Sequence, residues 1–261
     1  MDAEATPGYG RRKKDSVDDL VAGADELSEL QERLYASSRA DATDAAVLLV
    51  LQGMDTAGKG GIIRHVLGSV DPQGVQLTAF KKPTRGELAH DFLWRISRRV
   101  PEPGMIGVFD RSHYEDVLIH RVRGLSSPDV VERRYGMIRE FEAELAESGT
   151  AVRKVMLHIS RDEQRRRLEE RLDRPDKHWK FNPGDIDERA YWDEYQEAYQ
   201  IAIERTSSVL APWYVVPADH KWLARWAVHA ILLDTLRAMN PQWPPATFDV
   251  EEQRARLAAS A

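Results

Sequence analysis

The hydrophobic pattern of the chain begins with a short run that is apolar without interruption. Residues 45–51 read AAVLLVL, which is typical of a β-strand buried on both faces of a parallel sheet. Glycines crowd residues 53–61, and the apolar residues of 62–67 then recur at the spacing of a helix. This stretch therefore predicts a strand, a glycine-rich loop and a helix in direct succession.

The alternation of strand-like and helix-like patterns continues along the chain. It predicts an α/β fold with a mainly parallel five-stranded sheet that is covered by helices on both faces, in three layers. Ligands of such sheets bind beyond the carboxyl ends of the strands. Further strands are predicted at 75–80, 105–109, 152–159 and 213–216. Further helices are predicted at 24–38, 87–100, 128–148, 162–172 (with Ser160 as its N-cap), 185–208 and 222–239.

Both ends of the chain are predicted to lie outside this fold. Residues 1–22 are mostly polar and are expected to form a flexible N-terminal tail. Prolines follow the last predicted helix, so residues 241–261 are expected to form a C-terminal tail. No linker-like segment interrupts residues 23–240, which predicts a single domain.

Composition and charge narrow the classes of function. The chain has no cysteine, which excludes disulfides, thiolate zinc sites and cysteine nucleophiles. The formal net charge of −6 argues against nucleic acid as a partner. No apolar run is long enough to span a bilayer and no signal peptide is visible, so we expect no membrane partner and a cytoplasmic location.

The glycine-rich segment carries the first candidate chemistry. Residues 53–60 read GMDTAGKG and match the G-x-x-x-x-G-K core of the Walker A loop, or P-loop. Gly53 and Gly58 would let backbone N–H groups turn toward phosphate, and Lys59 would add a positive charge. Gly60 stands where the strict motif has a magnesium-binding Ser or Thr, so Asp55 is expected to hold the metal instead. The alternative is a tight turn with an incidental lysine.

The second candidate group follows the predicted strand at 105–109, where the sequence reads DRSHYED. Asp110 is placed like the second metal-binding carboxylate of a P-loop enzyme, and Arg111 could contact a transferring phosphoryl group. The alternative for Asp110 is a helix N-cap. Glu115 and Asp116 are candidates for assisting the metal or the acceptor. The residues between them are expected to be a structural histidine, His113, and a core tyrosine, Tyr114.

A basic segment lies between two predicted helices. Residues 171–184 mix cations and aromatic residues with prolines and a glycine, which is typical of a loop and could form a lid over phosphate. The predicted lid cations are Arg171, Arg174, Lys177 and Lys180. The cations at 165–167 are instead expected to form a solvated helix face. The aromatic residues Trp192, Tyr195 and Tyr199 are expected to pack in a core or an oligomer interface.

Together these motifs resemble the polyphosphate kinase 2 family. The stretches GMDTAGKGG, PTRGE, DRSHYED, RLDRPDKHWKFNPGD and YWDEYQEAY occur in the family's order and spacing over about residues 25–239. The resemblance implies a thymidylate-kinase-like P-loop fold with a helical lid, and dimers or tetramers. It also implies reversible phosphoryl transfer between inorganic polyphosphate and a nucleotide, without a covalent enzyme intermediate.

The resemblance assigns roles to matching positions. Asp55 and Asp110 would hold Mg²⁺, for which Mn²⁺ can substitute, and Lys59 and Arg111 would contact the transferring phosphates. The lid cations would follow the polyphosphate chain. Gly60 stands where relatives often have Asp. The acceptor is left open between AMP and ADP, with GMP and GDP as further candidates, because HYED resembles one subgroup whereas Asp110 is typical of the others.

Two other functions compete with this one. An ATP-dependent nucleotide kinase would share the loop, although the long basic lid and Gly60 argue against it. A non-catalytic module that binds polyanions would keep the loop but would not need the carboxylates Asp55 and Asp110.

Overall fold

The computed structural model describes residues 1–10 and 12–260 and is built around one parallel sheet. The order of its five strands is β2-β3-β1-β4-β5, and all neighbours are parallel. Every residue of β1 is buried, as expected for its uninterrupted apolar run, and β1 pairs with both β3 and β4. The strands are β1 Ala46–Gln52, β2 Val75–Ala79, β3 Ile106–Asp110, β4 Thr150–His158 and β5 Trp213–Pro217.

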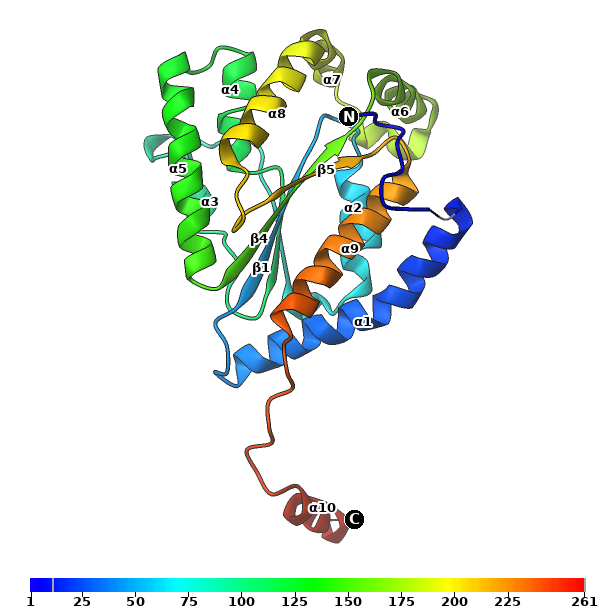
Figure 1. Ribbon diagram of the computed structural model, residues 1–261, viewed down its shortest axis with the longest axis vertical. Coiled ribbons are helices and arrows are strands. Elements are labelled where there is room, and N and C mark those ends of the chain that lie inside the picture. The colour runs from blue at the N-terminus through cyan, green and yellow to red at the C-terminus, as the bar shows by residue number, and fades with distance from the viewer. Residues whose placement is uncertain (11, 261) are drawn as a thin grey trace.

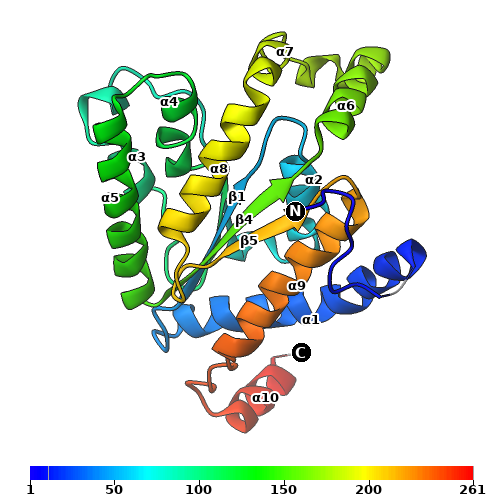
Figure 2. The same cartoon turned by 45° about the horizontal axis from the view of Figure 1, so that its top comes forward.

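Helices cover both faces of this sheet, which confirms the predicted α/β class (Figure 1). One layer holds α1, α2 and α9, and the other holds α3, α4, α5 and α8, while α6 and α7 stand beyond the carboxyl ends of the strands (Figure 2). The helices are α1 Lys13–Arg39, α2 Lys59–His65, α3 Trp94–Ser97, α4 Ile119–Val122, α5 Pro128–Glu147, α6 Arg161–Asp173, α7 Gly184–Glu188, α8 Trp192–Thr206, α9 Lys221–Met239 and α10 Val250–Ala259. Short 3₁₀ turns are η1 Leu67–Ser69, η2 Pro72–Gly74, η3 Glu87–Ala89, η4 His113–Asp116, η5 Pro175–Lys180 and η6 Arg189–Tyr191.

Within the described residues, no helix is both long enough and apolar enough to cross a membrane.

Two predicted helices are interrupted. The helix expected at 87–100 is reduced to η3 and α3, because the Asp91 side chain accepts a hydrogen bond from the Leu93 N–H and starts a new turn. Leu88, which such a helix would place on its apolar side with Phe92 and Ile96, is 66% exposed. The helix expected at 185–208 is divided into α7, η6 and α8. The Ser160 cap is confirmed, since its hydroxyl accepts from the Glu163 N–H.

The N-terminal segment is not the flexible tail predicted for 1–22. α1 begins at Lys13, and the Tyr9 ring packs against Trp222 and Trp226 of α9 at centroid distances of 5.4 and 4.8 Å. The sequence hides this helical start because Val17 and Val21 are exposed. Arg11 and Ala261 lie outside the described residues. At the other end, residues 241–249 carry no regular structure, and α10 projects away from the sheet (Figure 1).

Candidate functional site

Two adjoining pockets lie at the carboxyl ends of the strands and share Asp55 and Arg111. The larger pocket, about 530 Å³, has the glycine loop and α2 as its floor. The smaller pocket, about 220 Å³, lies between the loop after β3, the lid segment and α8. The larger pocket is lined by residues 55–62, Arg64, His65, Asp110, Arg111, Arg171, Lys177, Lys180, Lys221, Ala224 and Arg225. The smaller pocket is lined by residues 53–55, Arg111, Glu115, Ile119, Asn182, Gly184, Asp185, Glu188, Tyr195 and Tyr199.

The glycine loop needs glycine at its two ends. Gly53 has φ +152° and Gly58 has φ +118°, and a Cβ on Gly53 would approach the Leu157 carbonyl oxygen to 2.8 Å. Lys59 follows as the first residue of α2, and its Nζ donates to the Gly53 carbonyl at 2.8 Å. The loop thus closes on its own lysine. Gly53, Gly58, Lys59 and Gly60, all predicted phosphate contacts, lie at the two pockets.

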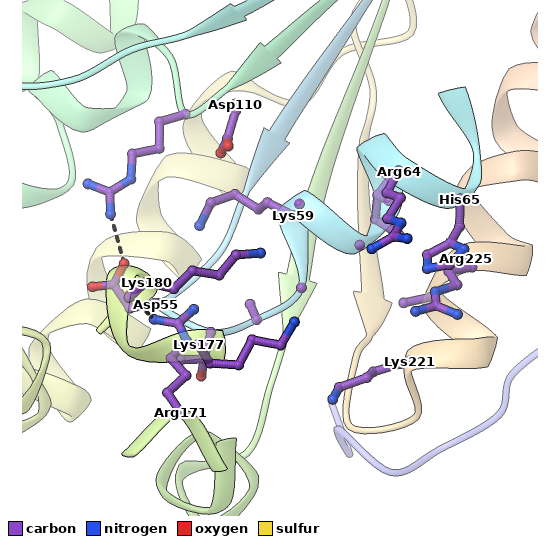
Figure 3. A pocket seen from close by; sticks show the side chains of 18 residues that line it. Asp55, Lys59, Arg64, His65, Asp110, Arg171, Lys177, Lys180, Lys221 and Arg225 are labelled. Atoms are coloured by element: carbon purple, nitrogen blue, oxygen red, sulfur yellow. Dashed lines mark hydrogen bonds and ion pairs between the residues drawn. The ribbon is translucent and has the colours of Figure 1, made fainter. Parts of the chain in front are cut away.

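Carboxylates from two strand ends flank Lys59. Figure 3 shows the Lys59 side chain extending between Asp110 and Asp55. Burial lowers the pKa of the Lys59 ammonium and nearby Arg111 lowers it further, while Asp55 and Asp110 act against both. Asp110 ends β3 but caps no helix, because Ser112 is the N-cap of η4. The alternative reading of Asp110 as a cap is therefore wrong.

Arg111 is held in one place by its backbone and its side chain. It has φ +63°, its N–H donates to the Leu51 carbonyl at 3.1 Å, and its guanidinium lies 2.7 Å from Asp55. A residue other than glycine adopts this left-handed conformation at a cost, which such contacts compensate. The predicted pairing of Asp55, Lys59, Asp110 and Arg111 at one site is thus present in the structure.

The donor set at this site fits magnesium better than a metal that needs a protein cage. Among the described residues there is no group of three or more His, Asp or Glu side chains that could hold a metal. Asp55 and Asp110 both line the larger pocket. Magnesium typically takes one or two protein carboxylates and completes its shell with water and phosphate oxygens. Asp55 and Asp110 beside the glycine loop fit the protein's share of such a shell.

Glu115 and Asp116 are neighbours that point to different places. Glu115 reaches the smaller pocket, and burial raises the pKa of its carboxyl group. Asp116 instead contacts His120 at 3.4 Å and Arg134 at 3.8 Å and lines neither pocket. The prediction that Asp116 assists the metal or acceptor is not supported, because this side chain is used to hold α4 and α5 together.

The lid segment contributes three of its four predicted cations to the larger pocket. Arg171, Lys177 and Lys180 line it, and Arg171 also braces the segment by contacting the Lys180 carbonyl and Asp185. Arg174 lines neither pocket, because its guanidinium pairs with Asp176 at 2.9 Å and Glu170 at 3.4 Å. Its predicted role in binding phosphate is therefore not borne out by its position.

The opposite wall of the larger pocket is basic as well, which sequence reasoning missed. It carries Arg64 and His65 on α2 and Lys221 and Arg225 on α9 (Figure 3). About 160 residues separate these two helices in the chain, so only their packing in the fold reveals the wall. The one available signal was the position of Arg64 in the helix that follows the loop.

Arg167 departs from the prediction that residues 165–167 form a solvated helix face. Arg165 and Arg166 are 71% and 60% exposed, in agreement with a solvated helix face. Arg167 is only 4% exposed, and its guanidinium contacts backbone carbonyls of the glycine loop. A run of three arginines on one helix therefore contains two surface residues and one buried residue that reaches the site.

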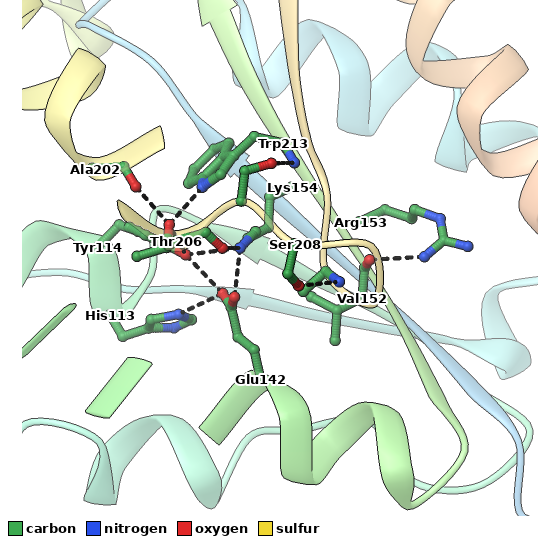
Figure 4. Close-up of polar contacts among 12 residues, drawn as sticks. His113, Tyr114, Glu142, Val152, Arg153, Lys154, Ala202, Thr206, Ser208 and Trp213 are labelled. Carbon is green, nitrogen blue, oxygen red and sulfur yellow. Dashed lines mark hydrogen bonds and ion pairs between the residues drawn. The ribbon is translucent and has the colours of Figure 1, made fainter. Parts of the chain in front are cut away.

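A buried polar cluster supports the turn η4 from behind (Figure 4). Tyr114 donates to Glu142 at 2.9 Å, and Lys154 contacts the Tyr114 hydroxyl, the Glu142 carboxylate and the Thr206 carbonyl. His113 lies 3.3 Å from Glu142. The expected structural histidine and core tyrosine are both confirmed. Trp192 and Tyr199 are buried as expected, and Tyr195 and Tyr199 also line the smaller pocket.

Comparisons with known proteins agree on one family. The family model described as Polyphosphate kinase 2 (PPK2) matches residues 11–244. The chain is 47% identical to an AMP/ADP-polyphosphate phosphotransferase of Meiothermus ruber, over 94% of the chain and 90% of that protein. It is 46% identical to an ADP-polyphosphate phosphotransferase of Rhodopseudomonas palustris, over 87% of the chain and 81% of that protein. The crystal structure of polyphosphate kinase 2 from Arthrobacter aurescens superposes with a TM-score of 0.96 at 56% identity, over 100% of this chain and 92% of that one. The chain therefore belongs to the polyphosphate kinase 2 family, as its motifs predicted, and is a kinase-type transferase.

Proposed function

We propose that this enzyme transfers phosphoryl groups reversibly between inorganic polyphosphate and adenine nucleotides, both AMP and ADP, in a magnesium-dependent reaction. One observation supports this proposal above all others: a mainly basic pocket and a mainly acidic pocket adjoin each other and share Asp55 and Arg111. The M. ruber relative is named for both AMP and ADP and the R. palustris relative for ADP, which supports polyphosphate with an adenine nucleotide as the substrates. Guanine nucleotides are proposed as further acceptors.

The larger pocket suits the polyphosphate donor. Two carboxylates line it, Asp55 and Asp110, whereas its cations come from the glycine loop, α2, the lid segment and α9. A chain of linked phosphates carries negative charge along its whole length, so it needs cations on both sides. This local excess of positive charge on a protein with a net charge of −6 favours a small polyanion.

The smaller pocket suits the nucleotide acceptor. Arg111 is the cation on its edge, while Glu115, Asp185 and Glu188 make the remainder acidic. A second polyphosphate would be repelled there. A nucleotide could instead place its terminal phosphate at Arg111 and its apolar base toward the tyrosines of α8, Tyr195 and Tyr199.

The arrangement needs no covalent intermediate and little base chemistry. Phosphoryl transfer depends mainly on alignment and on stabilising charge on the transferring group. Lys59 and Arg111 approach the boundary of the pockets from separate elements, so they can contact that group from two sides. Bound magnesium, held by Asp55 and Asp110, would neutralise further phosphate charge. Manganese prefers similar oxygen ligands and would substitute.

The proposal is tested by changing the donor and the acceptor separately. The enzyme is incubated with polyphosphate, Mg²⁺ and each of AMP, ADP, GMP and GDP, and nucleotide products are measured by chromatography. We expect products from AMP and ADP, and none after chelation of the metal. Turnover with ATP plus AMP but none with polyphosphate would identify an ATP-dependent nucleotide kinase. Tight binding of polyphosphate without any product would identify a binding module.

A further inference from the structure

The underside of the glycine loop rests on two side chains of α6. Gln164 Nε2 donates to the Asp55 carbonyl at 3.1 Å. Arg167 Nη1 donates to the Thr56 carbonyl at 3.0 Å and to the Ala57 carbonyl at 3.1 Å. Three consecutive carbonyls of the loop are thus held on the side that faces α6.

Arg167 uses all of its hydrogen-bonding capacity in this position. A guanidinium has five N–H donors in a fixed planar fork. Besides the two loop carbonyls, Nη2 donates to the carbonyls of Ala218 at 2.6 Å and Asp219 at 3.0 Å, and Nε pairs with Glu163 at 2.7 Å. The side chain is 4% exposed, so water does not replace these contacts. Lysine keeps the charge but has no such fork.

Holding the carbonyls fixes the direction of the N–H groups. In a trans peptide the carbonyl and the following N–H point to opposite sides of the chain. When the carbonyls of Asp55 and Ala57 point toward α6, the N–H groups of Thr56 and Gly58 are directed to the other side, where the larger pocket lies. Thr56 has φ +64°, an unfavourable conformation that needs support from its surroundings.

The same two side chains connect this loop to the walls of the pocket. Ala218 and Asp219 precede α9, whose first turns carry Lys221 and Arg225. On the lid side, Gln164 Oε1 accepts from Arg189 Nη1 at 2.7 Å, and Arg189 opens η6 behind the lid segment. α6 therefore lies at the junction of the glycine loop, the lid and the α9 wall.

We propose that Arg167 and Gln164 are positioning residues for the transfer reaction. They hold the carbonyls of residues 55–57 so that the N–H groups of Thr56 and Gly58 are directed toward the bound phosphates, while the Ala57 N–H donates to the Met54 carbonyl within the loop. Arg167 also fixes the separation between the loop and the α9 wall. Neither residue is placed to touch substrate. The identity of the polyanion rests on the proposed function, whereas the clamp itself rests on the contacts of α6.

The test compares Arg167→Lys and Gln164→Met with Arg166→Met as a matched control. Arg166 is the neighbouring exposed arginine and also pairs with Glu163, but it contacts no carbonyl of the loop. For Arg167→Lys we expect kcat/KM for polyphosphate to fall about 100-fold, the scale of a misplaced reacting group. For Gln164→Met, which loses one loop contact, we expect a loss of about 10-fold. The KM for nucleotide should stay within about twofold, because the smaller pocket keeps its lining.

Binding of inorganic tripolyphosphate, measured by calorimetry, separates this inference from the proposed function. If the wild-type enzyme fails to bind tripolyphosphate, the proposed donor is wrong. If the wild type binds it and both Arg167→Lys and Gln164→Met bind and turn over as the wild type does, the clamp is wrong. A lower melting temperature with unchanged kcat and KM in the two variants would also overturn it. Should Arg167→Lys fail to fold, Gln164→Met alone decides between these outcomes.

Discussion

Two lysines with restricted access to solvent, Lys59 and Lys154, show how differently one side chain is used within this fold. Lys154 is completely buried, and its ammonium contacts the Glu142 carboxylate, the Tyr114 hydroxyl and the Thr206 carbonyl. Among the described residues, the Lys59 ammonium has one hydrogen bond, to the Gly53 carbonyl, and faces the larger pocket. Burial lowers the pKa of both groups.

The difference lies in how many donors each ammonium has left. An ammonium has three N–H donors. Lys154 satisfies them within the protein, so it stabilises the junction of β4, α5 and α8 and can offer nothing to a ligand. Lys59 keeps donors available where phosphate oxygens are expected. A partly satisfied lysine at a pocket therefore indicates a binding group, and a fully satisfied one indicates a structural group.

The largest effect is expected from Lys59→Met. We expect kcat with polyphosphate to fall by about 10²–10³-fold, because a positioned donor to the transferring charge is lost. The melting temperature should not fall, since the folded protein has to bury this ammonium against its preference for water. Steady-state rates and thermal unfolding measured on the same sample check both expectations. Near-normal rates would contradict the assignment of Lys59 to the reaction.

Lys154→Met is expected to have the opposite outcome, in which stability is lost. Removing Lys154 leaves the Glu142 carboxylate buried without its cation, which costs about 3–5 kcal/mol in the free energy of unfolding. Denaturant titration measures this loss. The double variant Lys154→Met with Glu142→Leu removes both charges and should recover most of the stability. A double variant as unstable as the single one would show that the ion pair is not what the cluster needs.

A third prediction compares cations within the lid segment. Lys177→Ala combined with Lys180→Ala should raise the KM for polyphosphate about 10-fold, since both side chains line the larger pocket. Arg174→Ala is the matched control, and its KM should stay within about twofold, because Arg174 pairs with Asp176 and Glu170. The measurement is repeated with short and long chains. Equal losses in the two variants would mean that the lid rearranges around its substrate.

The smallest effect is expected from Asp185→Asn. Burial and the nearby Asp55 raise the pKa of Asp185 to about 6. Above that pH the folded protein holds an unfavourable carboxylate, so the amide variant should be more stable by roughly 1 kcal/mol at pH 7.5. As the pH falls through 6 the wild type takes up a proton, and the two stabilities should converge near pH 4. Parallel unfolding curves at every pH would contradict the raised pKa.

The sequence predicted the parts of this enzyme that depend on local pattern. The buried strand β1, the glycine loop and the placement of Asp110 and Arg111 after β3 follow from short-range spacing, and all are present. The parallel pairing of all neighbouring strands confirms the sheet expected from alternation, and the family is the one that the motifs predicted.

What could not be predicted depends on side-chain direction and on distant packing. Three consecutive arginines look alike in sequence, yet only Arg167 turns inward, because one residue of a helix advances about 100° around its axis. Asp116 is adjacent to Glu115 but faces the opposite way. Arg225 reaches the pocket only because α9 packs beside α2.

The ion pair between Asp55 and Arg111 lies at the border of the two pockets. Each of these charges is therefore partly neutralised before any ligand binds. The pair joins Nη2 to Oδ1, so a phosphate can still bind other N–H donors of Arg111, and a cation the second oxygen of Asp55, but each meets a charge that already has a partner. The attraction gained on binding is reduced by this existing pair, which limits affinity while leaving donors and oxygens for the contacts made during transfer. Products formed on either side would therefore be released readily, as the proposed reversible transfer requires.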